Sequence, residues 1–351
     1  MYILSACCIS PQDTFVHNGM FPPVRVLKGN RWSCIEPDYK TCIADATLRR
    51  RMSRVVKMGV TAAMGCVERA GVQPDAIITA TGLGCLFDTE KFLDALTDNE
   101  LQLNPTPFIQ STFNTVGSQV ALMLNNHGYN NTYVHRGFSF ESALLDAMMQ
   151  MEEDTAHVLV GCFDETTGTS FEIMRRLGFW KKELTESNQL YTVQTKGTAS
   201  GEGAAFFMLS SQPTADISPV RISGVHFFNT SADETCVSRQ LTEFLASMQK
   251  SVDDISLLML GSNGDVSGDE IYHRLASGLF PGKPYCYFKN LCGEYFTASG
   301  FALYLTFGIL TSQSVPEGIT CHGHIPTKVN NILIYNHFQK INHSLIFLEL
   351  H

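Results

Sequence analysis

The sequence has no apolar run long enough to cross a membrane. Its longest candidate, Phe301–Leu310, is interrupted by Gly308 and is well short of the roughly 20 residues that a spanning helix needs. Basic residues are also scarce, because 25 Lys and Arg face 34 Asp and Glu and leave a net charge of −9. An acidic balance of this kind argues against nucleic acid as the main ligand. We therefore predict neither a membrane segment nor a nucleic-acid partner.

Paired cysteine spacing is absent as well. The 11 cysteines are scattered along the chain, and residues 1–10 lack the basic start and cleavage site of a secretory signal. Cys321, His322 and His324 could bind a metal, but no second ligand pair stands at zinc spacing, which favours a surface or strand-end position. We expect reduced thiols, no metal, no cofactor and a cytoplasmic location.

What is present is an alternation of short β-like runs and helical stretches. The 351 residues are 44% hydrophobic, enough for two compact halves, which we place at 1–215 and 216–351 because Ser, Pro, Thr and Asp gather near the boundary. The apolar rhythm predicts a helix over Asp45–Gly71 and another over Ser139–Met151, with Ser139 as its N-cap. Strands are expected at Tyr2–Ile9, Ala204–Leu209, Arg221–Phe228, Ile255–Leu260, Asn331–Tyr335 and Ser344–Leu350, and buried strands at Ala76–Thr79 and His157–Val160.

Five sequence blocks, in order along most of the chain, resemble β-ketoacyl-acyl-carrier-protein synthases. They are Leu48–Gly71, Thr81–Leu86 (TGLGCL), Asn104–Ala121, Val158–Asp164 (VLVGCFD) and Gly201–Ala205 (GEGAA). Each motif alone is weak, but their order and spacing are specific. The resemblance implies a thiolase-like α/β fold of five α-β-α-β-α layers, built from two similar halves, and a dimer.

The catalytic positions of that family are substituted in this sequence. The family uses a cysteine at a helix N-terminus as the acyl acceptor, with two histidines and a lysine at the malonyl thioester. By the resemblance, the cysteine position falls on Gly137 and the first histidine on Gly261, or on Ser262 if the gap shifts. The second histidine is Glu294, while the lysine is retained as Lys289.

Two neighbouring segments also differ from the family. Lys289 and Glu294 stand five residues apart and could form an ion pair in place of a substrate clamp. The glycine-rich C-terminal loop is replaced by Asn336–Asn342 (NHFQKIN). Loss of condensation chemistry is the simplest account of these substitutions.

Degenerate ketosynthases without the cysteine act, by the resemblance, as chain-length factors that pair with an active ketosynthase in type II polyketide, aryl-polyene or fatty-acid synthesis. Phe108, Thr112 and Phe113 would then limit chain length across the interface. An acyl carrier protein is the further implied partner. It could meet the basic cluster Arg49, Arg50, Arg51, Arg54 and Lys57, although a solvated helix face explains the cluster slightly better.

Two other functions remain open at this stage. Ser139, with His135 as its base, could serve an acyltransferase or a decarboxylase, although a serine at a helix start is more often a cap. The chain could also pair with itself as a homodimer that binds acyl groups without catalysis.

Overall fold

The computed structural model describes residues 1–15, 21–99, 103–153, 155–213, 220–231 and 233–351. The N-terminal elements are β1 (Tyr2–Ile9), α1 (Tyr39–Cys42), α2 (Ala46–Arg51), α3 (Arg54–Ala70), β2 (Ala76–Ala80), α4 (Leu86–Asn99), α5 (Pro105–Gln110), α6 (Thr115–Leu124), β3 (Asn130–Tyr133), α7 (Ser139–Glu152), β4 (His157–Asp164), α8 (Gly168–Arg176) and β5 (Gly203–Ser210). The C-terminal elements are β6 (Val220–Asn229), α9 (Glu234–Ser247), β7 (Leu257–Leu260), α10 (Glu270–Gly278), β8 (Tyr285–Tyr287), α11 (Lys289–Cys292), α12 (Ala298–Ser312), β9 (Cys321–His322), β10 (Asn331–Phe338) and β11 (Asn342–Leu350).

The two halves repeat one strand order. The N-terminal strands run β3-β2-β4-β5-β1, and the C-terminal strands run β8-β7-β10-β11-β6, with β9 added at the far edge. In each half the first three strands pair in parallel and the last two pair antiparallel. Among the described residues, β1 and β6 meet at the single pair Tyr2 and Arg221, where one half joins the other. The boundary predicted at 215/216 lies outside the described residues and stays a prediction.

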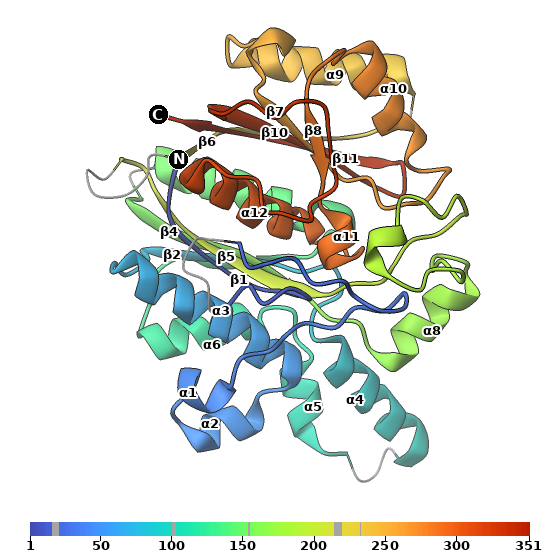
Figure 1. Ribbon diagram of the computed structural model, residues 1–351. Coiled ribbons are helices and arrows are strands. Elements are labelled where there is room, and N and C mark those ends of the chain that lie inside the picture. Colours follow the sequence, from blue (N-terminus) through green and yellow to red (C-terminus); the bar gives the residue numbers. More distant parts are fainter. Residues whose placement is uncertain (16–20, 100–102, 154, 214–219, 232) are drawn as a thin grey trace.

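Helices cover and separate these sheets in five layers (Figure 1). α3 and α6 lie on the outer face of the first sheet, α7 and α12 lie between the sheets, and α9 and α10 cover the second sheet. α12 is apolar on all sides because both of its faces contact a sheet. The apolar run of Phe301–Leu310 is therefore the centre of the core, and the five-layered expectation is confirmed.

Most of the predicted strands and helices are present, with ends that differ by a few residues. The prediction of a single helix over Asp45–Gly71 is wrong. This segment is two helices, α2 and α3, because Met52 takes an extended backbone (ψ 132°) and Ser53 continues it. Gly71 ends α3 as expected, at a positive φ of 68° that glycine adopts without a Cβ penalty.

Cysteine pairing also departs from the sequence expectation. Cys286 of β8 and Cys321 of β9 are cross-strand neighbours and form a disulfide. The expectation that every thiol is reduced is therefore wrong at this pair. The bond attaches the short edge strand β9 to the second sheet.

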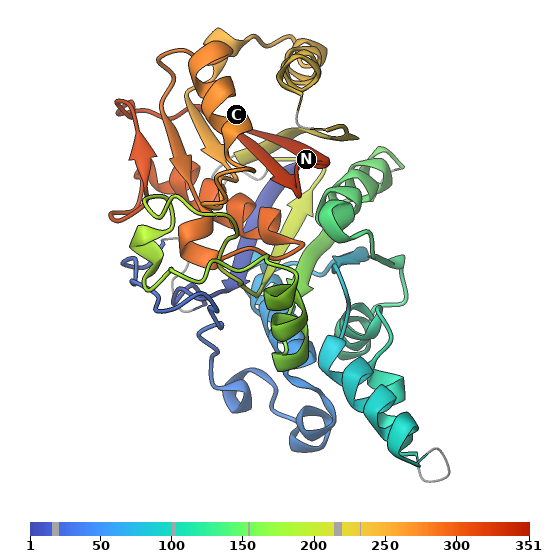
Figure 2. The same ribbon diagram turned by 90° about the vertical axis from the view of Figure 1, so that its right-hand side faces the viewer.

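α4 and α5 project away from the five layers (Figure 2). Their rings pack on each other, with Phe92 and Phe108 centroids 5.1 Å apart, yet several large apolar side chains on this projection face solvent. Within the described residues, no helix combines the length and apolarity needed to span a bilayer.

Candidate functional site

Position 137, which the resemblance assigns to the nucleophile, has no room for a side chain. Gly137 lies in a one-turn 3₁₀-helix, Arg136–Phe138, between β3 and α7, and is buried. A Cβ added there would lie 2.8 Å from the Cβ of Phe338 and 3.3 Å from the Cβ of Asn342. The strand-to-helix turn that would present a nucleophile is therefore kept, but another segment occupies the space in front of it.

That segment is the hairpin between β10 and β11, which stands in place of the glycine-rich loop. Phe338 pairs with Asn342 across it, and the turn is tight because Gln339 and Lys340 both adopt positive φ, 53° and 61°. The ring of Phe338 packs against Phe296 with centroids 4.9 Å apart. Phe296 and Phe338 form an aromatic pair, and its member Phe338 fills the space in front of Gly137.

The alternative pair of Ser139 and His135 does not form a catalytic dyad. The hydroxyl of Ser139 accepts the backbone N–H of His135 at 2.7 Å and donates to the carbonyl of Arg136 at 3.0 Å. The ring of His135 instead stacks on Phe138. Ser139 is the first residue of α7 rather than its N-cap, so that expectation is wrong, because Phe138 precedes the helix. Its buried hydroxyl fastens the turn that carries Gly137.

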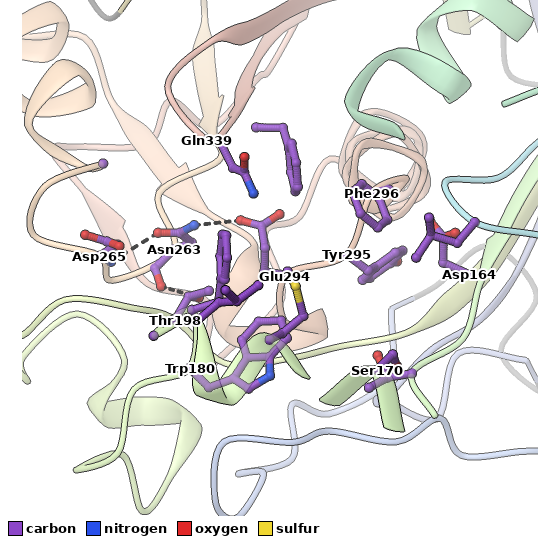
Figure 3. Close-up of a pocket in the computed structure, with 18 of the residues that line it drawn as sticks. Asp164, Ser170, Trp180, Thr198, Asn263, Asp265, Glu294, Tyr295, Phe296 and Gln339 are labelled. Carbon is purple, nitrogen blue, oxygen red and sulfur yellow. Dashed lines mark hydrogen bonds between the residues drawn. The ribbon is translucent and has the colours of Figure 1, made fainter. Parts of the chain in front are cut away.

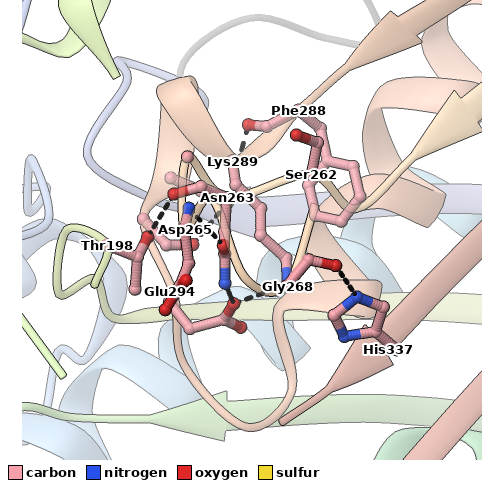
Figure 4. A network of polar contacts seen from close by, with 12 residues as sticks. Thr198, Ser262, Asn263, Asp265, Gly268, Phe288, Lys289, Glu294 and His337 are labelled. Atoms are coloured by element: carbon pink, nitrogen blue, oxygen red, sulfur yellow. Dashed lines mark hydrogen bonds and ion pairs between the residues drawn. The ribbon is translucent and has the colours of Figure 1, made fainter. Parts of the chain in front are cut away.

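A polar network lies at the two positions that the resemblance assigns to histidines (Figure 4). Lys289 is fully buried and donates to Glu294 at 2.7 Å. Asn263 donates its amide to the same carboxylate oxygen at 2.6 Å. The ion pair expected from the five-residue spacing is therefore present, and the ammonium of Lys289 and the carboxylate of Glu294 are each other's partners.

Backbone contacts hold Glu294 in this place. Gly293 adopts a φ of 77°, and its neighbour across the contact is Gly201 of the GEGAA block. A Cβ at either glycine would come within 3 Å of the other chain segment. The N–H of Glu294 donates to Ala199 at 2.8 Å, and the N–H of Gly201 donates to Glu294 at 3.1 Å. The GEGAA motif thus fixes the position of residue 294.

The first histidine position is also closed. A Cβ at Gly261 would lie 2.1 Å from the amide oxygen of Asn336. Ser262, the other candidate, donates to Asp269 at 2.6 Å, and that carboxylate also accepts the backbone N–H groups of Asn263 and Gly264. The retained Asp269 therefore shapes the loop from 262 to 269, and neither candidate position offers a free side chain.

Next to the aromatic pair lies a cavity of about 400 Å³. Its walls come from the TGLGCL turn, α8, the segment 178–180, the loop 263–268, the residues after α11 and the β10–β11 hairpin (Figure 3). Asp164, Glu165, Trp180, Lys196, Tyr295 and Lys340 are among the lining residues. Gly137 is not, because Phe338 lies between it and the cavity.

Two adjacent carboxylates line one part of this cavity. Asp164 is fully committed, since it accepts from Thr81, from the N–H of Gly82 and from Thr297, and burial raises its pKa. Glu165 accepts the N–H of Phe87 at 2.9 Å. Burial raises the pKa of Glu165 to about 7, so this side chain is only partly ionised at neutral pH.

His337 borders the cavity from the hairpin as a neutral imidazole. Its Nε2 donates to the carbonyl of Gly268 at 2.9 Å, its Nδ1 accepts the N–H of Lys340, and its ring stacks on Tyr272. Burial, then the charge of Lys289 and the neighbouring His343 and Lys340, lower the pKa of His337 to about 3. The folded state therefore keeps His337 neutral at pH values at which the same histidine in the unfolded chain becomes protonated, below its ordinary pKa of about 6.5.

Stability should fall as the pH drops below 6.5, by about 1.4 kcal/mol per pH unit for this histidine. The sign follows because the unfolded state binds more protons than the folded state between pH 3 and 6.5. Urea unfolding of the His337→Gln variant is expected to show a correspondingly shallower slope between pH 6.5 and 5. The exposed His324 supplies the control variant His324→Gln. An unchanged slope in His337→Gln would contradict the assignment.

The residues predicted to limit chain length lie on or beside the projecting helices. Phe108 of α5 and Phe113 are 56% and 50% exposed, and Thr112 is exposed between them. The ring of Phe113 covers Gly84, because a Cβ there would lie 2.4 Å from it, and Gly84 lines the cavity. These side chains therefore join an exposed apolar surface to the cavity wall.

The basic residues divide into free and bound groups. Arg54 donates to both carboxylate oxygens of Glu202 and to Glu36, so its charge is neutralised within the fold. Arg49 donates to the carbonyl of Ile43. A surface groove of about 350 Å³ beside α2 collects Lys40, Arg49, Arg50 and Lys57, and Arg51 is exposed on the same helix.

The possible metal ligands at the C-terminal edge have other contacts. Cys321 is in the disulfide, and the ring of His322 stacks on Tyr285. Across the part of the chain that the structure describes, no three His, Cys, Asp or Glu side chains are arranged to hold a metal ion.

Sequence reasoning did not find the aromatic pair or the role of Asn263. Phe338 stands within the replaced loop Asn336–Asn342, and Asn263 directly follows Ser262. Their functions depend on contacts between segments far apart in the sequence, so the order of residues carried no usable signal for them.

Comparison with known proteins confirms the resemblance stated above. A sequence model described as the β-ketoacyl synthase N-terminal domain matches residues 31–181. The sequence finds no match among curated proteins. The remaining similarity is therefore one of structure.

Solved structures extend the likeness to the whole chain. The ishigamide ketosynthase/chain length factor aligns with a TM-score of 0.80 at 15% identity, covering 100% of this chain and 98% of that chain. The Xenorhabdus doucetiae ketosynthase ApeO in complex with its chain length factor ApeC aligns at 0.74 and 14%, with the same coverage. AntDE:AntF, a type II PKS acyl-carrier protein in complex with its ketosynthase, aligns at 0.77 and 14%, again covering 100% and 98%. The chain thus has the thiolase-like ketosynthase fold from end to end.

Proposed function

We propose that this chain is a non-condensing ketosynthase-like subunit that acts as a chain-length factor for an intact ketosynthase. The observation that carries the proposal is the filled position 137, where a glycine stands and Phe338 leaves no space for a nucleophile. The ion pair at Lys289 and Glu294 supports it, because these groups bind each other instead of a thioester. Its fold is also similar to solved structures of ketosynthases with chain length factors, which supports a role of the same kind.

The partner would bind the exposed apolar surface around the edge strand β3. Large side chains that face solvent lie on α5, α6 and α7 and directly before and after β3, and an exposed apolar surface of this kind marks an interaction site. They include Phe108, Ile109, Phe113, Leu122, Tyr129, Val134, Leu145 and Met149. We place the ketosynthase here, with Phe108, Thr112 and Phe113 facing its acyl tunnel. A second copy of this chain is the alternative occupant.

The carrier protein would bind the part of the basic cluster at and beside the groove next to α2, which Glu36 and Asp38 also line. Lys40, Arg49, Arg50, Arg51 and Lys57 form this proposed docking patch, and Arg54 is left out because Glu202 and Glu36 neutralise it. The proposal places the assembly in the cytoplasm, in a type II polyketide, aryl-polyene or fatty-acid pathway.

Reconstitution tests this function. The chain alone, mixed with acyl- and malonyl-carrier protein, should give no condensation product. Addition of a ketosynthase from the neighbouring genes should give product together with a stable 1:1 complex. Phe113→Ala should lengthen the product and leave the complex intact, while Ile173→Ala, at an exposed position of α8 that does not line the cavity, serves as control. Condensation by the chain alone that Ser139→Ala abolishes would overturn the proposal, and a chain that pairs only with itself favours the homodimer.

A further inference from the structure

Lys181 is a buried lysine whose charge has no carboxylate partner. The residue follows Trp180 in the sequence, and its side chain is fully excluded from solvent. Among the described residues Lys181 forms no ion pair. Burial of an ammonium group is costly unless other groups of the protein replace its water. The charge of Lys181 must therefore be stabilised by hydrogen-bond acceptors around it.

Four oxygen atoms from two segments surround this ammonium and form an oxygen cage. Lys181 donates to the carbonyl of Thr195 at 2.6 Å and to that of Gly264 at 2.7 Å. The carbonyl of Val193 accepts at 2.9 Å, and the hydroxyl of Thr195 lies at 3.2 Å. Because that hydroxyl donates its own hydrogen to Glu183, a lone pair faces Lys181. The cage consists of acceptors alone, and an ammonium, which has hydrogens and no lone pair, complements it.

The backbone that carries the oxygen cage is held by further hydrogen bonds. The N–H of Lys181 donates to the carbonyl of Thr198, and the N–H of Thr198 donates to that of Phe179, both at 2.8 Å. Gly264 turns its carbonyl toward the cage with a φ of 83°, which glycine adopts readily. Its N–H donates to Asp269 at 2.7 Å. The oxygens are therefore positioned by contacts besides those of the Lys181 ammonium, as in a preformed binding site.

The size and surroundings of the oxygen cage suit a monovalent cation. Most of its distances to the Lys181 nitrogen, 2.6 to 3.2 Å, are longer than the about 2.0–2.6 Å at which Mg²⁺ and Ca²⁺ bind oxygen. Backbone carbonyls are the groups with which proteins replace the hydration shell of K⁺. Burial lowers the pKa of Lys181, whereas the charges of Asp265, Asp269 and Glu183 act in the opposite direction. These more distant carboxylates favour a positive charge in the cage.

We propose that this oxygen cage is a binding site for a monovalent cation of the size of K⁺ or NH₄⁺, and that the chain fills the site with its own ammonium. Lys181 is a tethered ion that joins the segment 193–195 to the loop 263–266. This loop carries Asn263, whose amide donates to Glu294 (Figure 4). The unaltered protein therefore needs no ion from solution to hold the loop. The inference does not depend on the proposed partnership, because it concerns contacts within this chain alone.

Exchange of the tethered ammonium for a free ion tests the site. Lys181→Ala removes the charge and leaves the oxygen cage open, so in choline chloride it should unfold at a lower temperature than the unaltered protein. At equal ionic strength, KCl or NH₄Cl should raise the midpoint of this variant by about 2–4 °C, because the ion binds only the folded state. LiCl should raise it less, because Li⁺ is too small to contact four oxygens at these distances. The unaltered protein should show no such cation preference.

Two control variants separate ion binding from general effects of salt. Lys181→Met fills the space of the lysine stem with an uncharged side chain and should gain no more stability from KCl than the unaltered protein does. Lys182→Ala, at the exposed neighbouring position, should behave like the unaltered protein in every salt. If K⁺ and NH₄⁺ stabilise Lys181→Ala no more than Lys181→Met, the oxygen cage is not a cation site and the proposal is overturned.

A measurement on the unaltered protein decides the question if the variants at position 181 do not fold. In protein with ¹⁵N-labelled lysine, NMR should detect the side-chain nitrogen of Lys181 at neutral pH as an ammonium whose hydrogens exchange slowly with water. Thr195→Val removes one oxygen of the cage and should shift this signal, while Thr192→Val, at an exposed position, should not. A neutral amine at Lys181, or exchange as fast as that of the exposed Lys182, would contradict a caged cation.

Discussion

Replacement of Lys289 by methionine is expected to lower the free energy of unfolding by about 3–5 kcal/mol. Lys289 is fully buried and its ammonium is 2.7 Å from Glu294, whose side chain is only 10% exposed. Removal of the cation leaves a carboxylate that is buried and uncompensated, which is the costly way to break such a pair. Urea unfolding of the purified variant measures the loss.

The double variant Lys289→Met, Glu294→Leu decides whether the pair or the packing matters. It should recover most of the stability, because both charges leave together. Some cost should remain, since Asn263 loses its acceptor. The exposed pair Arg274 and Glu270 is the matched control, and Arg274→Ala should cost less than about 1 kcal/mol. If Lys289→Met also costs less than about 1 kcal/mol, the buried ion pair does not stabilise the fold.

Restoring a cysteine at position 137 should not restore acylation. Gly137→Cys places a Cβ 2.8 Å from that of Phe338, so the variant is overpacked and should lose about 1–3 kcal/mol of stability. Mass spectrometry after incubation with acyl-CoA or acyl-carrier protein should find no thioester. The physical reasons are the occupied space and the Lys289–Glu294 pair where the second histidine would stand.

Two further variants separate these causes. Gly137→Cys combined with Phe338→Gly removes the Cβ that the added Cβ would meet at 2.8 Å, so the double variant should lose less stability than the sum of the two single losses. Gly168→Cys introduces a cysteine where an added Cβ meets nothing within 4 Å and should fold like the unaltered protein. An acyl adduct at Cys in the single Gly137→Cys variant, without loss of stability, would contradict the filled-site description.

Much of the fold could be predicted from the sequence, because its strands and helices carry local patterns. β1, β4 and β5 are apolar runs buried on both faces, and Gly71 marks the end of α3. The break between α2 and α3 was missed because the apolar rhythm continues through Met52, which is itself buried. The disulfide was missed because its cysteines become neighbours only when β8 and β9 pair.

The candidate site divides in the same way. The Lys289–Glu294 pair was foreseen because five residues of sequence hold both groups near one turn. The filling of position 137 was not, because Phe338 is 201 positions further along the chain and reaches Gly137 through a hairpin whose turn geometry is decided in three dimensions.

The sequence by itself determined the alternation of strands and helices, the resemblance to ketosynthases and the residue types at positions 137, 261 and 294. These are properties of local pattern and motif order, so they can be read without coordinates. Only the tertiary structure decided that the space in front of Gly137 is filled, that Arg54 is neutralised and that a cavity remains beside the aromatic pair. Each of these depends on side chains from distant segments competing for one volume or one charge, and such competition is settled only when the segments pack together.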